Sequence, residues 1–125
     1  MSTSAEKNCA CGGAPTLIFS CSGAADVGEL ADRTARRLTR DGAGKMYCLA
    51  GVGGKVDNIL VNVKAAEKIL AIDGCPVNCA RATLEQAGIG TFAHVCLQEA
   101  GLKKGQSPVN EENLAAALNA AKAMV

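Results

Sequence analysis

The feature that most constrains the fold of this chain is a fourfold alternation between short apolar runs and longer segments with helical periodicity. Strands that alternate with helices in this way predict a mainly parallel sheet with helices on its faces. The runs are apolar along their length, as expected for strands that are covered on both sides. We therefore predict a single-domain, three-layer α/β fold with a mainly parallel four-stranded sheet of the flavodoxin or Rossmann type. The predicted strands are residues 16–21, 45–49, 68–72 and 93–97, and the predicted helices are residues 26–40, 56–67, 76–86 and 110–125.

Length and charge set the domain organisation and limit the function. The 125 residues suit one domain, which we place at residues 15–125. Residues 1–14 are polar and then glycine-rich, and they predict a flexible tail that carries Cys9 and Cys11. A net charge of +1 gives no basis for binding nucleic acid or an anionic membrane. No apolar run approaches a membrane span and the polar N-terminus is no signal peptide, so we expect a cytoplasmic protein.

Seven cysteines are the main functional signal in the chain. In a reducing cytoplasm such a set points to metal binding or redox chemistry more than to a disulfide framework. Cys21 ends the first predicted strand, Cys48 lies near the end of the second, and Cys75 follows the third. The carboxyl ends of parallel strands share one edge, so these three thiols converge if the first strand lies between the other two. Cys79 lies one helical turn beyond Cys75.

Four converging thiolates would suit one tetrahedral zinc ion per chain, with Zn–S distances of about 2.3 Å. The predicted ligands are Cys21, Cys48, Cys75 and Cys79, which would hold zinc or another soft metal ion in a structural or metal-handling role. An iron–sulfur cluster also takes four thiolates and stays open. The alternative from another class is a thiol-based redox or sulfur-transfer protein that uses Cys75 and Cys79. Four protein ligands close a site and argue against hydrolytic catalysis, whereas the ligand-binding edge argues for it, so whether the chain is an enzyme is left open.

A second pattern overlaps this set, because Cys75 and Arg81 have the C-x5-R spacing of phosphatase-like anion loops. The interior of the loop argues against that chemistry, since it contains no glycine and Pro76 removes one of the amides needed. We expect Arg81 to be a solvent-facing helix residue.

Several weaker signals have structural interpretations. We expect Cys96 to be a buried core residue, His94 to be structural, and Asp73 to fix the turn before the third helix. A basic stripe on the first predicted helix indicates a solvated face. Residues 51–55 are glycine-rich but lack the spacing of a phosphate loop, so they predict a plain loop beside Cys48.

Three separated motifs resemble the DGC domain family of small bacterial and archaeal proteins. They are Ser20-Cys-Ser-Gly-Ala24 with Val27-Gly28, Lys45-Met46 with Cys48-Leu-Ala-Gly51 and Gly53-Gly54, and Ile72-Asp-Gly-Cys-Pro76 with Cys79. The resemblance runs from about residue 15 to near the C-terminus, and the family takes its name from the tripeptide Asp73-Gly74-Cys75. It implies zinc binding by four chelating cysteines, which match Cys21, Cys48, Cys75 and Cys79. It implies a site and no particular activity.

Overall fold

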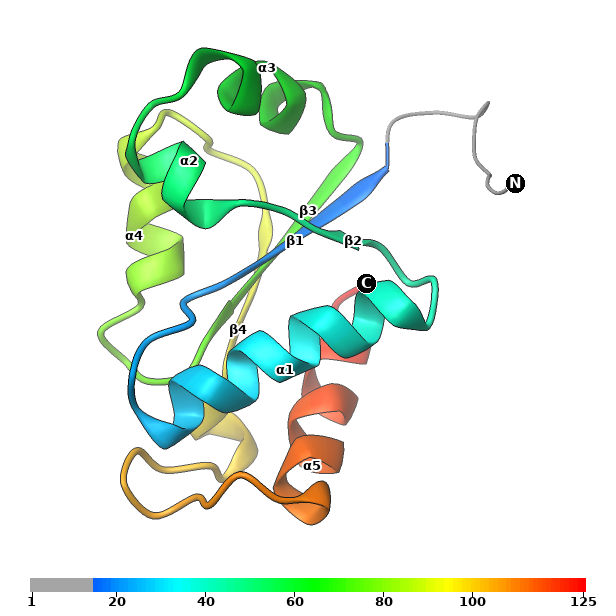
Figure 1. Ribbon diagram of the computed structural model, residues 1–125, viewed down its shortest axis with the longest axis vertical. Helices are drawn as coiled ribbons and strands as arrows, with labels where there is room; N and C mark the ends of the chain where they lie inside the picture. Colours follow the sequence, from blue (N-terminus) through cyan, green and yellow to red (C-terminus); the bar gives the residue numbers. More distant parts are fainter. Residues whose placement is uncertain (1–14) are drawn as a thin grey trace.

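Four parallel strands form the centre of the molecule in the order β2-β1-β3-β4 (Figure 1). They are β1 (Thr16–Ser20), β2 (Lys45–Met46), β3 (Lys68–Asp73) and β4 (Ala93–Cys96) in the computed structural model, which describes residues 15–125. The α/β prediction is confirmed, and the sheet is parallel at each pairing. The predicted tail, residues 1–14 with Cys9 and Cys11, lies outside the described residues.

Helices cover both faces of this sheet and give the predicted three layers (Figure 1). The helix α1 (Asp26–Arg40) and the helix α5 (Glu111–Lys122) pack on one face, together with a 3-10 turn, η2 (Leu97–Ala100). The opposite face is covered by α2 (Leu49–Gly53), α3 (Asp57–Ala65) and α4 (Cys79–Gln86). The Asn110 side chain accepts a hydrogen bond from the Asn113 amide at 2.8 Å, so Asn110 caps α5 as its residue type predicts.

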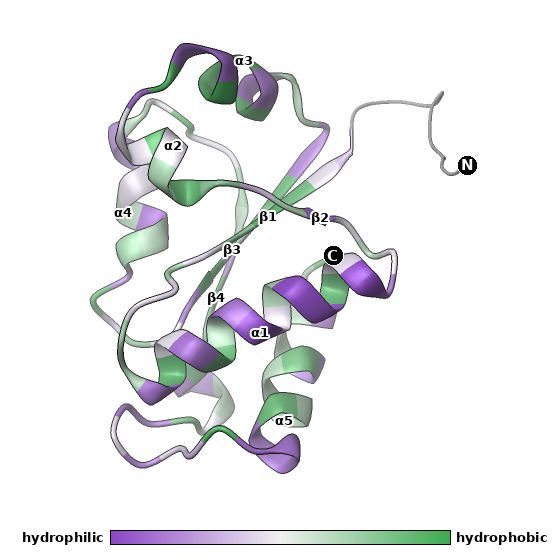
Figure 2. Cartoon of the chain, in the orientation of Figure 1, coloured by the Kyte–Doolittle hydropathy of each residue, from purple (hydrophilic) through white to green (hydrophobic). Residues whose placement is uncertain are grey.

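Alternating strand residues divide the core into two halves. Ile18, Leu70 and Ile72 pack under α1 and α5, whereas Leu17 and Phe19 pack under α2 and α4. The face of α1 turned away from the sheet is largely hydrophilic, while the central strands are hydrophobic (Figure 2). The two central strands, β1 and β3, therefore have no solvated face, which explains their apolar sequence.

The second strand is shorter than predicted, and a short helix replaces the predicted glycine loop. Pairing of β2 with β1 covers two positions, and the chain then turns into α2 after Cys48. Gly51 lies so close to Ile59 that a Cβ would approach its Cγ1 to 2.8 Å. Tertiary packing of this kind overrides the low helix propensity of a glycine-rich stretch. The prediction of a plain loop was wrong for residues 51–53, which belong to α2, whereas residues 54–55 form a turn.

The third predicted helix also begins late, at Cys79 instead of residue 76. Asn78 has a left-handed backbone with φ of 58°, and its amide donates to the Cys75 carbonyl at 3.1 Å. Residues 75–78 therefore form a tight turn between β3 and α4 instead of a first helical turn. The helix α4 takes its cap from outside this turn, as described below.

Strand order reverses between β1 and β3, because the connection from β1 leads to β2 on one side and the later strands lie on the other. Folds of this class bind ligands at the carboxyl ends of the strands beside such a point. Cys21 and Gly74 follow the two strands at that position. Within residues 15–125, no helix combines the length and the apolar content that crossing a bilayer requires.

Candidate metal and thiol site

The four predicted ligands all lie at the carboxyl edge of the sheet. Cys21 directly follows β1, Cys48 lies two residues beyond β2, Cys75 lies two residues beyond β3, and Cys79 is the first residue of α4. The strand β1 lies between β2 and β3, as convergence of these thiols requires. Cys21 and Cys75 are partly buried, whereas Cys48 and Cys79 are exposed.

Two cavities at this edge divide the cysteines between them. The first, which we call the thiol crevice, has a volume of about 180 Å³ and contains Cys21, Cys75 and Cys79 in its wall, with Asp73 and Lys104. The second, which we call the β2 hollow, is wider, at about 770 Å³, and is lined by Cys21, Cys48, Tyr47, Arg36 and Thr83 among others. Cys21 belongs to both cavities and joins them.

Three of the four cysteines share the thiol crevice, but their side chains do not form a finished metal site. Among residues 15–125, no group of three or more histidine, cysteine, aspartate or glutamate side chains is arranged to hold an ion. Ligation by all four cysteines therefore requires a rearrangement at this edge, where Cys48 and Cys79 are the two exposed candidates. The assignment of these ligands stays a prediction.

Backbone amides contact two of the candidate ligands. The Gly74 amide donates to Cys21 Sγ at 3.4 Å, and the Gly51 amide donates to Cys48 Sγ at 3.3 Å. Hydrogen bonds to sulfur stabilise the negative charge of a thiolate, and in metal sites they orient the ligand. The donor chemistry at this edge thus fits a soft, thiophilic ion such as zinc.

Two glycines bring the cysteine-bearing loops together. A Cβ on Gly74 would lie 2.6 Å from the Val27 carbonyl oxygen, at the start of α1. A Cβ on Gly28 would lie 2.5 Å from the carbonyl oxygen of Gly23. Both loops therefore touch α1 by backbone contact, and no larger residue fits at positions 28 and 74 without displacing main chain. The Cys21 and Cys75 loops are close because of these contacts.

Asp73 supplies the cap that α4 lacks locally. Its side chain is buried at 1% exposure and accepts hydrogen bonds from the Ala80 amide at 2.8 Å and from the Arg81 amide at 3.1 Å. His94 Nε2, from β4, lies 2.9 Å from Asp73 Oδ2. His94 thus contacts a carboxylate that orders the fold, which supports the structural role expected for it. Asp73 does more than fix the turn, because it joins β3, α4 and β4.

The same contacts argue against an anion-binding loop between Cys75 and Arg81. An anion there would need the free amides at the start of α4, and the Asp73 carboxylate already accepts from two of them. Arg81 Nε lies 3.4 Å from Glu85 on the outer face of the helix, with half of its side chain exposed. Arg81 is therefore a solvent-facing residue, as predicted.

Cys96 and the basic residues of α1 do not belong to the cysteine site at the sheet edge. Cys96 is 6% exposed and packs in the core as predicted, and burial raises the pKa of its thiol. The basic stripe on α1 forms exposed pairs with acidic residues one turn away, which confirms a solvated face. These pairs are Glu29 with Arg33, Asp32 with Arg36, and Arg37 with Asp41.

Comparison with known proteins decides the family. A family profile described as DGC domain matches residues 17–121. This chain belongs to the DGC domain family. It is also 40% identical, over 88 residues, to a protein of Pseudomonas aeruginosa named "Anaerobic and virulence modulator AnvM". That match covers 70% of this chain and 67% of the relative. No solved structure matches this chain.

The tripeptide that names the DGC family has three separate roles in this fold. Asp73 caps α4 and contacts β4, and Gly74 permits the backbone contact with Val27. Cys75 lines the thiol crevice. Sequence reasoning selected the cysteine of this DGC motif for its chemistry, but it did not foresee the capping role, because Ala80 and Arg81 are seven and eight residues away from Asp73.

Proposed function

We propose that this DGC domain binds one zinc ion, or another soft metal ion, through Cys21, Cys48, Cys75 and Cys79. The observation that carries the proposal is the thiol crevice beside the point where strand order reverses. Its wall contains Cys21, Cys75 and Cys79, and Cys21 also lines the β2 hollow together with Cys48. Bound zinc would supply a tetrahedral centre with strong preference for thiolate ligands. A cytoplasmic location, where thiols stay reduced, suits this role.

Exposure of the ligands favours metal handling over a purely structural ion. A structural site is normally closed and buried, whereas Cys48 and Cys79 are exposed and the described residues hold no preformed ligand group. Accessible ligands allow an acceptor molecule to replace protein thiolates one at a time. We therefore propose that the ion is taken up and released at this edge. The name of the relative from Pseudomonas aeruginosa refers to anaerobic conditions, and thiolate sites are sensitive to oxygen.

Metal content of the untagged protein, purified without oxygen, tests this function. We expect one zinc per chain by mass spectrometry, normalised by amino-acid analysis because a single Tyr and no Trp give weak absorbance. Replacing Cys21, Cys48, Cys75 or Cys79 by serine should each reduce the bound zinc. The matched control is Cys96→Ala, which removes a core thiol and should keep the full stoichiometry.

The control at the N-terminus is a double variant, Cys9→Ser with Cys11→Ser, which should also bind one zinc. Loss of zinc in that variant would contradict the four-ligand assignment. Iron together with acid-labile sulfide would identify a cluster protein instead. Absence of metal in the wild-type protein, even after incubation with zinc, would refute the proposal.

The second candidate function is thiol redox or sulfur-transfer chemistry at Cys75 and Cys79. The observation that favours it is the exposure of Cys79 at the start of α4, beside a thiol in the same crevice and without an assembled metal site. A disulfide between Cys75 and Cys79 that forms with mild oxidant and is reversed by dithiol, in protein that takes up no zinc, would support this function. A zinc-loaded protein whose thiols resist oxidation until a chelator is added would exclude it.

A further inference from the structure

A lysine shares the thiol crevice with three candidate ligands. Lys104 lines that cavity with Cys21, Cys75 and Cys79, although it is 25 residues or more from any of them along the chain. The other charged residue in the wall is Asp73, whose carboxylate already accepts three hydrogen bonds. Lys104 therefore provides the positive charge that the described part of the chain brings to this cavity.

The turn that carries this lysine is fastened to the start of α1. Asp26 accepts hydrogen bonds from the Gly105 amide at 2.9 Å and from the Ser107 amide at 3.0 Å. Within the turn, Ser107 Oγ donates to the Lys103 carbonyl at 2.8 Å, and Gly105 has φ of +81°, which glycine adopts without strain. The amide hydrogen bond from Gly105, followed by that from Ser107, holds the pKa of Asp26 below its ordinary value. The turn that contains Gly105 is thus held by hydrogen bonds to Asp26 and by the hydrogen bond between Ser107 and Lys103.

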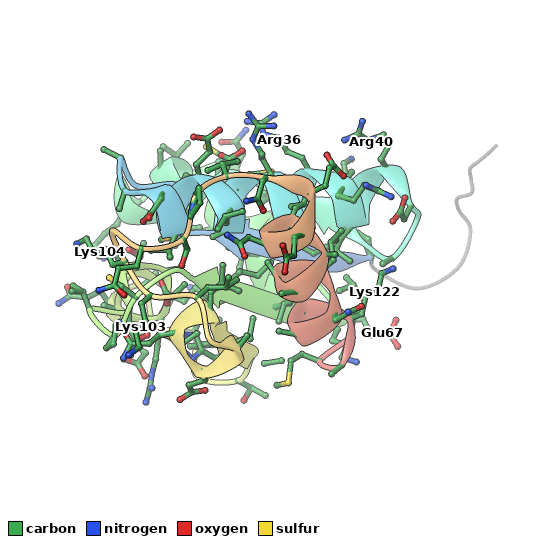
Figure 3. The ribbon with its side chains drawn as sticks, turned by 90° about the horizontal axis from the view of Figure 1, so that it is seen from below. Arg36, Arg40, Glu67, Lys103, Lys104 and Lys122 are labelled. Carbon is green, nitrogen blue, oxygen red and sulfur yellow. The ribbon has the colours of Figure 1, made fainter. Side chains whose placement is uncertain are left out.

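Figure 3 shows where this turn lies. Lys103 and Lys104 both lie at the end of the molecule at which α1 begins, and Arg40 lies where α1 ends. The thiol crevice is at the same end as the two lysines, because Val27 and Gly28 belong to its wall. Both lysines are exposed, but Lys104 lines the crevice and Lys103 lies outside that lining.

We propose that Lys104, positioned by Asp26, is the cation that offsets the negative charge of the metal-bound thiolates. This inference rests on the proposed metal function. Four thiolates around a divalent ion leave two negative charges uncompensated, and groups outside the ligand shell tune such a centre. An ammonium group at the crevice lowers that charge without replacing a ligand. Its exposure makes the effect moderate and dependent on salt.

The test is a charge series at position 104 with zinc as the probe. Zinc affinity is measured by competition with a chromophoric chelator, on full-length protein whose folding is checked by circular dichroism. We expect K104M to weaken zinc binding about three- to fivefold, K104R to remain within about twofold of wild type, and K104E to weaken it by roughly the square of the K104M loss. The matched control is K103M, which removes the same charge one residue away, outside the crevice lining, and should have a clearly smaller effect.

Two further measurements distinguish an effect of the Lys104 charge from an effect of the conformation of its turn. One is the salt dependence of zinc affinity, and the other is the D26A variant. The difference between wild type and K104M should shrink in about 1 M salt, where the screening length falls to roughly 3 Å. D26A releases the turn and should weaken binding about as much as K104M, with little further loss when both changes are combined.

The outcomes distinguish this inference from the function on which it rests. Wild-type protein that binds no zinc would overturn the proposed function. Wild-type protein that binds zinc no better than K104M, or K104R that is as weak as K104M, would overturn the role of Lys104 alone. A loss in K103M equal to that in K104M would also overturn it.

Discussion

Replacement of Gly74 by alanine is the most direct test of how the DGC motif shapes the site. The added Cβ would lie 2.6 Å from the Val27 carbonyl oxygen and 2.7 Å from the Val27 carbonyl carbon, where an ordinary contact is 3.4 Å or more. Both partners are main chain, so a flexible side chain cannot rotate out of the way. The loop after β3 or the start of α1 must shift by roughly 0.8 Å.

That shift is resisted on both sides. The β3 end is anchored by Asp73 in the cap of α4, and Val27 is buried at 1% exposure under the sheet. Overpacking of this kind costs about 2–3 kcal/mol of unfolding free energy. For a domain of this size the melting temperature should fall by roughly 6–15 °C.

The assay is urea unfolding followed by far-ultraviolet circular dichroism, with a chelator present so that metal binding does not contribute to stability. The matched control is Gly23→Ala, because a Cβ on Gly23 would meet nothing within 4 Å. We expect that control to lie within about 0.5 kcal/mol of wild type. Equal stability of the Gly74 and Gly23 variants would refute the close approach of the two loops.

Three further predictions concern the cap, the tether and the thiols. Asp73→Ala should lower the unfolding free energy by about 2–4 kcal/mol, because one buried and one part-buried amide of α4 lose their acceptor. A loss under about 1 kcal/mol by urea titration would contradict the capping role. The lowered pKa of Asp26 means that its contribution to stability is complete above about pH 3.8 and is lost as pH falls through the lower folded-state pKa. Asp26→Asn should therefore flatten the fall of the urea midpoint between about pH 5 and pH 3, and unchanged slopes would disprove the tether. Among the cysteines of residues 15–125 in metal-free protein, iodoacetamide should modify the exposed Cys48 and Cys79 first and the buried Cys96 last. Peptide mapping that finds Cys96 modified early would count against its burial.

The sequence was most informative where local pattern and tertiary structure agree. The helix over residues 26–40 was predicted with its observed bounds, because Leu30 and Leu38 mark its buried face and Gly42 and Gly44 follow its end. The convergence of the three strand-end cysteines was made conditional on β1 lying between β2 and β3, and the sheet has that order. These features depend on periodicity and on the topology rules of parallel sheets.

The features that were predicted wrongly depend on contacts between residues that are distant in the sequence. The short helix α2 depends on contact between Gly51 and Ile59, and the late start of α4 depends on a cap supplied by Asp73. The prediction of a strand over residues 45–49 was too long, because β2 is an edge strand that pairs with β1 at two positions. Lys104 was not selected as a site residue at all. Its signal is the hydrogen bonding between Asp26 and a turn about 80 residues later, which no local pattern reveals.

The only tyrosine of the chain occupies a useful position. Tyr47 lines the β2 hollow directly before Cys48, its ring centre lies 6.2 Å from that of Phe19, and its hydroxyl accepts a hydrogen bond from Asn62 at 2.7 Å. The chain contains no tryptophan, so all of its emission near 300 nm arises from this one ring. We expect a molecule that binds in the β2 hollow beside Cys48 to alter the environment of this one ring. The protein thus carries its own fluorescent reporter of occupancy, in a place where a synthetic dye would obstruct the cysteines.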